Sequence, residues 1–240
     1  MNIMNSVGAA AFALASLSPL EKNDDAPIRI TRADVEWSNQ KVVSAYGALV
    51  EMWTNDFNRI GEHFYAPRIA RYEGNVRTRC GIMPANNAQY CEATNTVYYD
   101  EVFVAAMAKF AGANLHTDGD MTGIGIIAHE MGHAVAMQLG HRSRRSYENE
   151  STADCLAGAF ANQAQKDRTL EEGDIDEAIF GMAMAGDPQP RLTGDDRFDT
   201  IIQARLSRQA HGTKEQRVRN FRAGLSGGPG ACLEEFKSSS

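Results

Sequence analysis

Residues 129–133 read HEMGH, and this pentapeptide constrains the chain more than any other feature. On a helix, His129 and His133 lie four positions apart, so their side chains project from one face, one turn apart. Two imidazoles at this spacing can bind a single zinc ion, and Glu130 beside them can activate a water molecule for hydrolysis. Because HExxH also arises by chance on surface helices, the surrounding residues have to decide between the two interpretations.

The register of residues 121–140, MTGIGIIAHEMGHAVAMQLG, favours a metal site. Four large apolar residues fall on the side that a helix buries in a core: Ile124, Ile127, Met131 and Val135. The two histidines fall opposite, beside the small residues Gly125 and Ala136. A plain solvent-exposed face would carry Lys, Glu and Gln there, whereas small residues leave room for a metal or a substrate.

A catalytic zinc needs three protein ligands and one open position, so a third ligand is expected on a neighbouring element. Residues 148–158 read ENESTADCLAG and predict a helix on which Glu150 and Asp154 share a face. Glu150 can therefore bind the metal, and Asp154 can accept a hydrogen bond from the free ring nitrogen of a ligand histidine. Glu148 competes for the ligand role, and an ordinary acidic helix start is the alternative explanation.

The cysteines predict disulfides rather than zinc ligands. Cys155 lies about 140° around the helix from Glu150, so it faces away from a metal held by that carboxylate. Four cysteines can pair completely in three ways. Because Cys80 and Cys91 bracket a loop that contains Gly, Pro and Asn, we favour Cys80–Cys91 and Cys155–Cys232. Four free buried thiols are the alternative.

The N-terminal residues bear on the compartment, since disulfides imply an oxidising one. Residues 6–20, SVGAAAFALASLSPL, form an apolar run with an A-x-A pattern that predicts a signal peptide cleaved near Ala15, although no Lys or Arg precedes it. The run is short for a transmembrane helix, and an apolar segment packed on the domain is the alternative. We therefore expect an exported protein (periplasmic, cell-envelope or secreted), with a leader and linker over 1–27, one domain over 28–236 and a tail over 237–240.

Composition and periodicity predict a single α+β domain that is mostly helical, with a small sheet ahead of the metal helix. The net charge of −7 argues against nucleic acid or anionic membrane surfaces as the main partner. The predicted strands are Arg68–Tyr72 and Thr96–Asp100. The predicted helices are Ala33–His63, Glu101–Ala111, Thr122–Leu139, Tyr147–Gln165, Ile175–Ala185, Asp196–Ser207 and Thr213–Leu225. Val97–Tyr99 is the candidate edge for binding an extended peptide, with core packing as the alternative.

Several blocks of the chain resemble a known family. They read CGIMPANNAQYCEATNTVYYDEVF from Cys80, AHEMGHAVAMQLG from Ala128, ENESTADCLAG from Glu148, HGTKEQRVRNFRAGL from His211 and a final GGPGACLEEF. Together they are similar to the "putative neutral zinc metallopeptidases", a bacterial group of exported or membrane-anchored HExxH proteins. The resemblance implies a zincin-like fold with Zn²⁺ held by His129, His133 and Glu150. The chain departs from the family at Glu92, where a Pro is usual, and in lacking the longer basic membrane anchor, which leaves anchoring open.

These features together predict a zinc metalloendopeptidase that acts on a protein or peptide, with Glu130 as general base. For the group that stabilises the oxyanion we suggest His211, with Tyr147 next, although His211 could equally be a helix-start residue bonded to backbone. Arg217 and Arg219 are expected to form salt bridges or to pack along a helix.

The competing hypothesis is a non-catalytic zinc-containing envelope scaffold or partner-binding module, in which His116 or His141 closes the site. The presence of Glu130 argues against it, because a structural zinc does not need that carboxylate.

Overall fold

Helices dominate the part of the chain that the computed structural model describes, residues 29–187, 194–200 and 211–237. They are α1 (Arg32–Arg59), α2 (Glu101–Leu115), α3 (Asp120–Gln138), α4 (Ser146–Asp167), α5 (Asp174–Met184) and α7 (Lys214–Gly227). The strands are β1 (Arg68–Tyr72), β2 (Val76–Thr78), β3 (Gly81–Met83), β4 (Ala88–Cys91) and β5 (Thr96–Asp100). The fold is therefore α+β and mostly helical, as the sequence predicts, with the strands ahead of α3.

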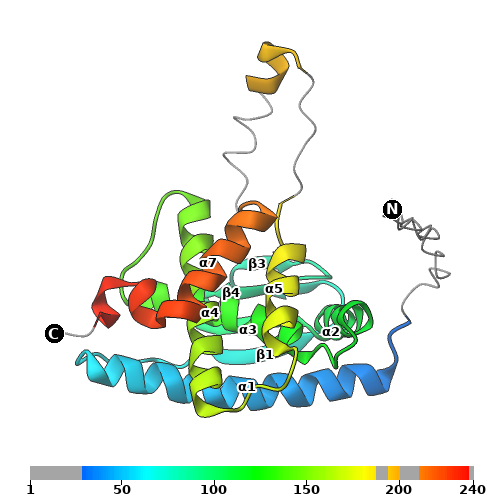
Figure 1. The fold of residues 1–240 in the computed structure, drawn as a ribbon, viewed down its shortest axis with the longest axis horizontal. Helices are drawn as coiled ribbons and strands as arrows, with labels where there is room; N and C mark the ends of the chain where they lie inside the picture. The colour runs from blue at the N-terminus through cyan, green and yellow to red at the C-terminus, as the bar shows by residue number, and fades with distance from the viewer. Residues whose placement is uncertain (1–28, 188–193, 201–210, 238–240) are drawn as a thin grey trace, which may run out of the picture.

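The longest helix, α1, runs along one side of the molecule (Figure 1). It begins with a capping box in which the side chains of Thr31 and Asp34 bond each other's backbone amides. Its fully buried residues Leu49, Trp53 and Phe57 recur at four-residue spacing and face the core. The helix ends at Arg59 instead of the predicted His63, because Gly61 adopts a positive φ of 77° that a helix cannot continue.

The main sheet has the order β1-β5-β4, with β1 parallel and β4 antiparallel to β5. The bounds of β1 and β5 match the predicted strands. Val97–Tyr99 is not the candidate edge but packs in the core, the other interpretation of these residues, because β5 is the central strand and is paired on both sides. Val97 and Tyr99 are accordingly buried, and the free edges of the sheet belong to β1 and β4.

The segment between Cys80 and Cys91 is not the loop that the sequence predicts. It contains β3, which pairs with β2 as a hairpin, and β4, which joins the main sheet. Gly, Pro and Asn do occupy the turns, and Asn86 adopts a positive φ, but they alternate with residues that pair as strands. Tyr72 stabilises the turn before β4 because its hydroxyl donates to the carbonyls of Pro84 and Asn87.

Helices α4 and α7 pack closely because each has a glycine at the contact. A Cβ on Gly158 would lie 1.9 Å from the carbonyl oxygen of Phe221, and one on Gly224 would lie 1.8 Å from that of Cys155. The disulfide Cys155–Cys232 ties α4 to the segment after α7, and Cys80–Cys91 forms the second bridge. The structure thus contains the pairing that the sequence favours.

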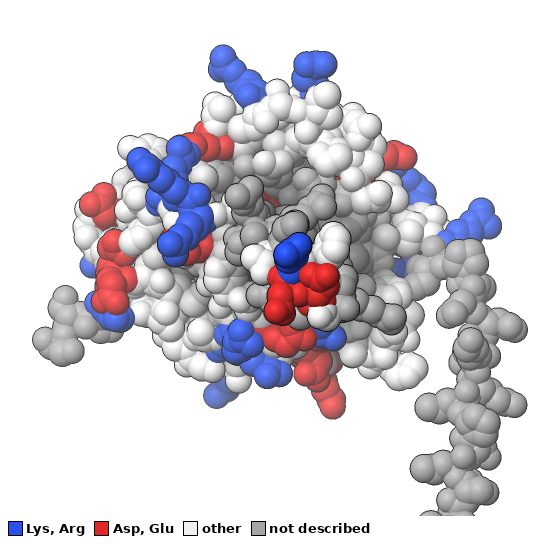
Figure 2. All heavy atoms as spheres, turned by 90° about the horizontal axis from the view of Figure 1, so that it is seen from above, with Lys and Arg blue, Asp and Glu red and all other residues white. Residues whose placement is uncertain are grey.

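Some predictions fall on residues that the structure does not describe, namely the leader with its cleavage near Ala15 and most of the helix Asp196–Ser207. Among the described residues, no helix is long and apolar enough to cross a membrane. On the face shown in Figure 2, the described Lys and Arg side chains form small groups near Asp and Glu instead of one continuous basic field.

Gly224→Ala is expected to lower the free energy of unfolding by about 1–3 kcal/mol or more, because its Cβ has to separate α7 from α4. Gly47→Ala is the matched control, since Gly47 lies in α1 and a Cβ there meets nothing within 4 Å. The control should be neutral or more stable by up to about 1 kcal/mol. Denaturant unfolding of the oxidised proteins measures both values, and equal midpoints would contradict the tight α4–α7 contact.

Candidate metal centre

His129, His133 and Glu150 converge from two helices. The Nε2 atom of His129 lies 3.1 Å from Glu150 Oε2, and that of His133 lies 3.5 Å from Glu150 Oε1. One potential ligand atom from each residue lies within 4.8 Å of the other two. A tetrahedral zinc with bonds of 2.0–2.2 Å separates its ligand atoms by about 3.3 Å. The two imidazoles and the carboxylate therefore fit a zinc ion in both chemistry and spacing.

Gly132, the fourth residue of HEMGH, allows this convergence. A Cβ at this position would lie 2.9 Å from the carbonyl oxygen of Ala153 and 3.2 Å from Cβ of Leu156, both in α4. Contacts below 3.0 Å are essentially never tolerated by a real Cβ. The glycine therefore lets α4 approach α3 closely enough for Glu150 to reach both histidines.

Asp154 lies directly behind His129, fully buried, as the sequence predicts for an orienting carboxylate. Its Oδ1 is 2.9 Å from Nδ1 of His129. Arg217 of α7 binds the same carboxylate, with Nη2 2.6 Å from Oδ1 and Nε 3.2 Å from both oxygens. The expected salt bridge of Arg217 is therefore present, but its connection to the metal ligand was not foreseen. In the sequence, the signal for this connection is that Arg217 belongs to the block HGTKEQR.

Electrostatics in the metal-free site favour a proton on His129. Burial alone would lower the pKa of His129, but the hydrogen bonds to Asp154 and Glu150 outweigh it and raise the pKa to about 10. Burial would raise the pKa of Glu150, yet its bonds to His129 and His133 hold it well below the usual range. Without metal, the imidazolium of His129 thus bridges two carboxylates.

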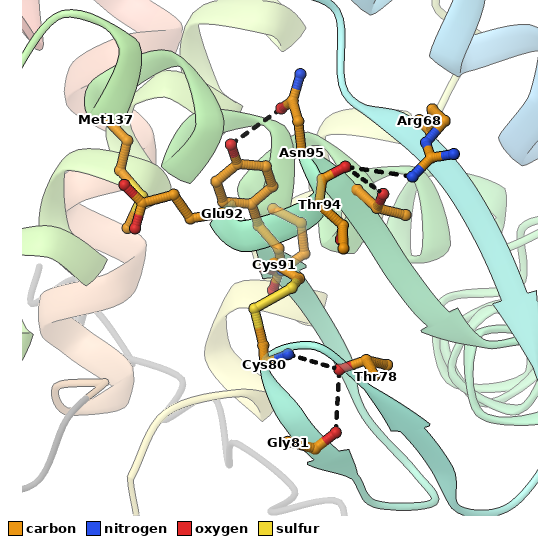
Figure 3. Close-up of a disulfide and its surroundings, with 12 residues drawn as sticks. Arg68, Thr78, Cys80, Gly81, Cys91, Glu92, Thr94, Asn95 and Met137 are labelled. Carbon is orange, nitrogen blue, oxygen red and sulfur yellow. Dashed lines mark hydrogen bonds between the residues drawn. A yellow bond between two sulfur atoms is a disulfide. The ribbon is translucent and has the colours of Figure 1, made fainter.

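Glu130 lies beside the ligands at the free edge of β4. Its Oε2 accepts a hydrogen bond of 2.7 Å from the backbone N–H of Tyr90, and the residue is buried. The disulfide Cys80–Cys91 joins the end of β4 to the start of β3 (Figure 3). The Tyr90 hydroxyl donates to Asn95 across the following turn. The edge strand β4, which contacts Glu130, is therefore fixed by the disulfide at its end and by its pairing with β5.

A cleft of about 650 Å³ opens onto this group of residues. Its lining includes the ligands, Glu130, the edge residues Asn87–Tyr90, His211 and Arg217. A further part of the lining is apolar and comes from α2, α3 and α5: Phe103, Met107, Ile126, Met137, Met182 and Met184. The sequence analysis did not assign β4 or this apolar wall to the site, although β4 lies within the block that begins at Cys80, because the block itself does not indicate which strand faces the metal centre.

His211 and Tyr147, the two candidates for oxyanion stabilisation, lie differently. His211 lines the cleft and is about half exposed, with Nδ1 3.4 Å from Asp187 Oδ1. Tyr147 packs its ring against the Gly212 backbone, where a Cβ would lie 2.7 Å away, and it does not line the described cleft. Because His211 lines the cleft and Tyr147 does not, the arrangement favours His211 as the candidate for oxyanion stabilisation.

The other residues considered as ligands lie away from the group. Glu148 bonds Ser143 and Arg145 at the exposed start of α4. His141 pairs with Glu235 at 2.7 Å, and His116 ends α2 in a left-handed conformation. Within the described ranges, the metal-binding group at the cleft contains His129, His133 and Glu150 alone.

A second acidic group, Asp118, Asp120, Asp174 and Glu177, lies at the start of α3. Lys41 is 2.6 Å from Asp120, and Glu177 accepts hydrogen bonds from the amides of Gly119 and Met121. Glu177 thus caps the start of α3, and Asp118 and Asp120 pair with Lys41, so these carboxylates have protein partners.

Comparison with known proteins agrees with this geometry. The family model described as "Putative neutral zinc metallopeptidase" matches residues 20–236. The chain belongs to this family. Uncharacterized proteins named YpfJ from Escherichia coli strains K12 and O6:H1 are each 33% identical over 207 residues, which cover 78% of this chain and 68% of the relative. No solved structure matches. Membership of the zinc metallopeptidase family implies Zn²⁺ as the metal, and His129, His133 and Glu150 form a candidate group that could hold it.

At pH 8, the protein is expected to release at least about one proton for each zinc ion that it binds. The pKa of His129, about 10 without metal, lies above this pH, so zinc has to displace a proton from Nε2. The zinc affinity should accordingly fall as the pH is lowered. Titration calorimetry in two buffers of different ionisation enthalpy counts the protons, and a heat that is independent of the buffer would contradict the protonated bridge.

Proposed function

We propose that this protein is a zinc-dependent metalloendopeptidase. The observation that carries the proposal is the convergence of His129, His133 and Glu150 in one cleft, with Glu130 beside them. Three protein ligands leave one coordination position open, as in catalytic zinc sites, whereas structural sites are closed by a fourth. Family membership supports the same activity.

The bound zinc would supply a Lewis acid that acidifies water and polarises the scissile carbonyl. Glu130 accepts the proton of the attacking water as the new carbon–oxygen bond forms. It then delivers this proton to the amide nitrogen as the carbon–nitrogen bond breaks, which releases a free amine and a carboxyl group. The hydrogen bond from Tyr90 N–H holds one oxygen of Glu130 and leaves the other for proton transfer.

Substrate binding as an added strand is supported by the free edge of β4. Successive residues of an antiparallel strand alternate in which side their backbone groups face. Since the N–H of Tyr90 points away from β5 to Glu130, the backbone groups of Ala88 face the same free edge. An extended peptide can pair there and pass the metal centre.

The apolar wall of the cleft favours a substrate with a large apolar side chain next to the scissile bond. Met107, Ile126 and Met182 line it from three different helices. Methionine side chains adapt to ligands of different shape, so we infer a preference for apolar residues as a class, with little selection among them.

The scaffold hypothesis is less well supported. Among the described residues, neither His116 nor His141 lies in the ligand group that would have to be closed. The two disulfides support export to an oxidising compartment, where we propose that the substrate is a protein or peptide.

Glu130→Gln is expected to retain about one zinc per chain but to lose hydrolysis of an unfolded protein, because the change spares all three ligands and removes the base. Metal analysis and a casein-type cleavage assay measure the two properties on the same preparation. Equal cleavage by the variant and the wild type would refute the mechanism, and zinc without cleavage in both would favour the scaffold.

His211→Ala is expected to lower kcat by about 100-fold with little change in KM or zinc content, because a donor that stabilises the oxyanion acts mainly in the transition state. Tyr147→Phe is the comparison, since its hydroxyl lies outside the cleft lining. A larger loss in kcat for Tyr147→Phe than for His211→Ala would reverse the assignment.

A further inference from the structure

Arg217 connects three helices at the back of the metal centre. It lies on α7 and is 4% exposed. Its Nε and Nη2 bind the carboxylate of Asp154 on α4, and its Nη1 donates to the carbonyl oxygen of Ala185 after α5 at 3.0 Å. Such a two-point contact fixes the plane of a carboxylate as well as neutralising its charge.

The same guanidinium lies next to the imidazole of a metal ligand. Nη2 of Arg217 is 3.3 Å from Nδ1 of His129. A guanidinium can only donate hydrogen bonds, and a carboxylate can only accept them. While Asp154 is present, it accepts from both Arg217 and His129 Nδ1–H. With one proton held on Nδ1 in this way, Nε2 is the nitrogen that faces Glu150 and that zinc can bind in place of a proton.

Removing Asp154 changes the hydrogen-bond acceptor that is available to Arg217. Nδ1 of His129 is then the acceptor that lies nearest to Nη2 of Arg217 among the contacts of this site. A bond from Arg217 to Nδ1 requires the tautomer in which Nε2 carries the proton, and this tautomer cannot bind zinc. The uncompensated positive charge also opposes a cation at the neighbouring position.

We propose that Arg217 is a positioning residue, and that its effect on zinc affinity depends on whether Asp154 is present. With the carboxylate present, Arg217 fixes it as the acceptor of His129 Nδ1–H and strengthens zinc binding. Without the carboxylate, Arg217 takes over Nδ1 and weakens zinc binding. The inference rests on the proposed zinc site but not on peptide hydrolysis.

The packing of α7 against α4 places Arg217 for this role. The close approach at Gly158 and Gly224 brings the two backbones together near Asp154. The disulfide formed by Cys155, the residue after Asp154, holds the segment that follows α7 against α4. Arg219, two residues along the same helix, is exposed.

The test is the zinc dissociation constant of the full chain, measured at pH 7.5 by competition with a chromophoric chelator. Arg217→Met should raise it about 10-fold and Asp154→Ala about 100-fold, the range found for groups that orient ligands. The double variant should bind zinc more tightly than Asp154→Ala alone. Arg219→Met, the matched control, should bind like the wild type.

A role confined to folding would make the double variant at best as good as Asp154→Ala, and that result would overturn the proposal. So would wild-type affinity in Arg217→Met. Circular dichroism establishes that each variant is folded, and Arg217→Gln replaces any Met variant that is not. These measurements use no substrate, so they test the role of Arg217 independently of peptidase activity. The Glu130→Gln comparison tests peptidase activity.

Nitrogen chemical shifts of His129 in the metal-free Asp154→Ala protein at pH 9 provide an independent measurement. They should report a proton on Nε2, where Glu150 also accepts it, and the share of the proton on Nδ1 should increase when Arg217 is replaced as well. A proton on Nδ1 in the single variant would contradict the proposed change of partner.

Discussion

The site depends on the close packing of α3 against α4 at Gly132. HExxH offers two potential ligands on one helix, and the third potential ligand has to come from a separate element at a fixed distance. Gly132 removes the side chain that would hold the helices apart, since any Cβ there meets the backbone of Ala153. Glu150 then lies within hydrogen-bond distance of His129. A glycine between two histidines is thus a packing requirement of the metal centre.

A second close contact, between α4 and α7, adds the support behind the ligands. Asp154 and Arg217 are both buried, and each would be costly to bury alone because an unpaired charge loses its hydration. Together they form a neutral pair beside His129. Arg217 thus brings α7 against the candidate metal site, and the Cys155–Cys232 bridge holds the segment after α7 to α4.

Much of this was predictable from local patterns, because the residues concerned lie on single helices. The positions of Glu150 and Asp154 follow from a four-residue spacing, and the bounds of β1 and β5 follow from short runs of strand-forming residues. The edge strand was not predictable, since strand order depends on pairing between distant segments. The role of Arg217 was also hidden, because its partner is 63 residues away in the sequence.

We expect one zinc ion to bind the imidazoles of His129 and His133 and the carboxylate of Glu150, with one coordination position left open. X-ray absorption at the zinc edge of the metal-loaded protein tests it most directly. Two histidine nitrogens are expected near 2.0–2.1 Å from the zinc, with oxygen atoms as the remaining ligands. Sulfur scattering near 2.3 Å, or a third or fourth histidine, would contradict it.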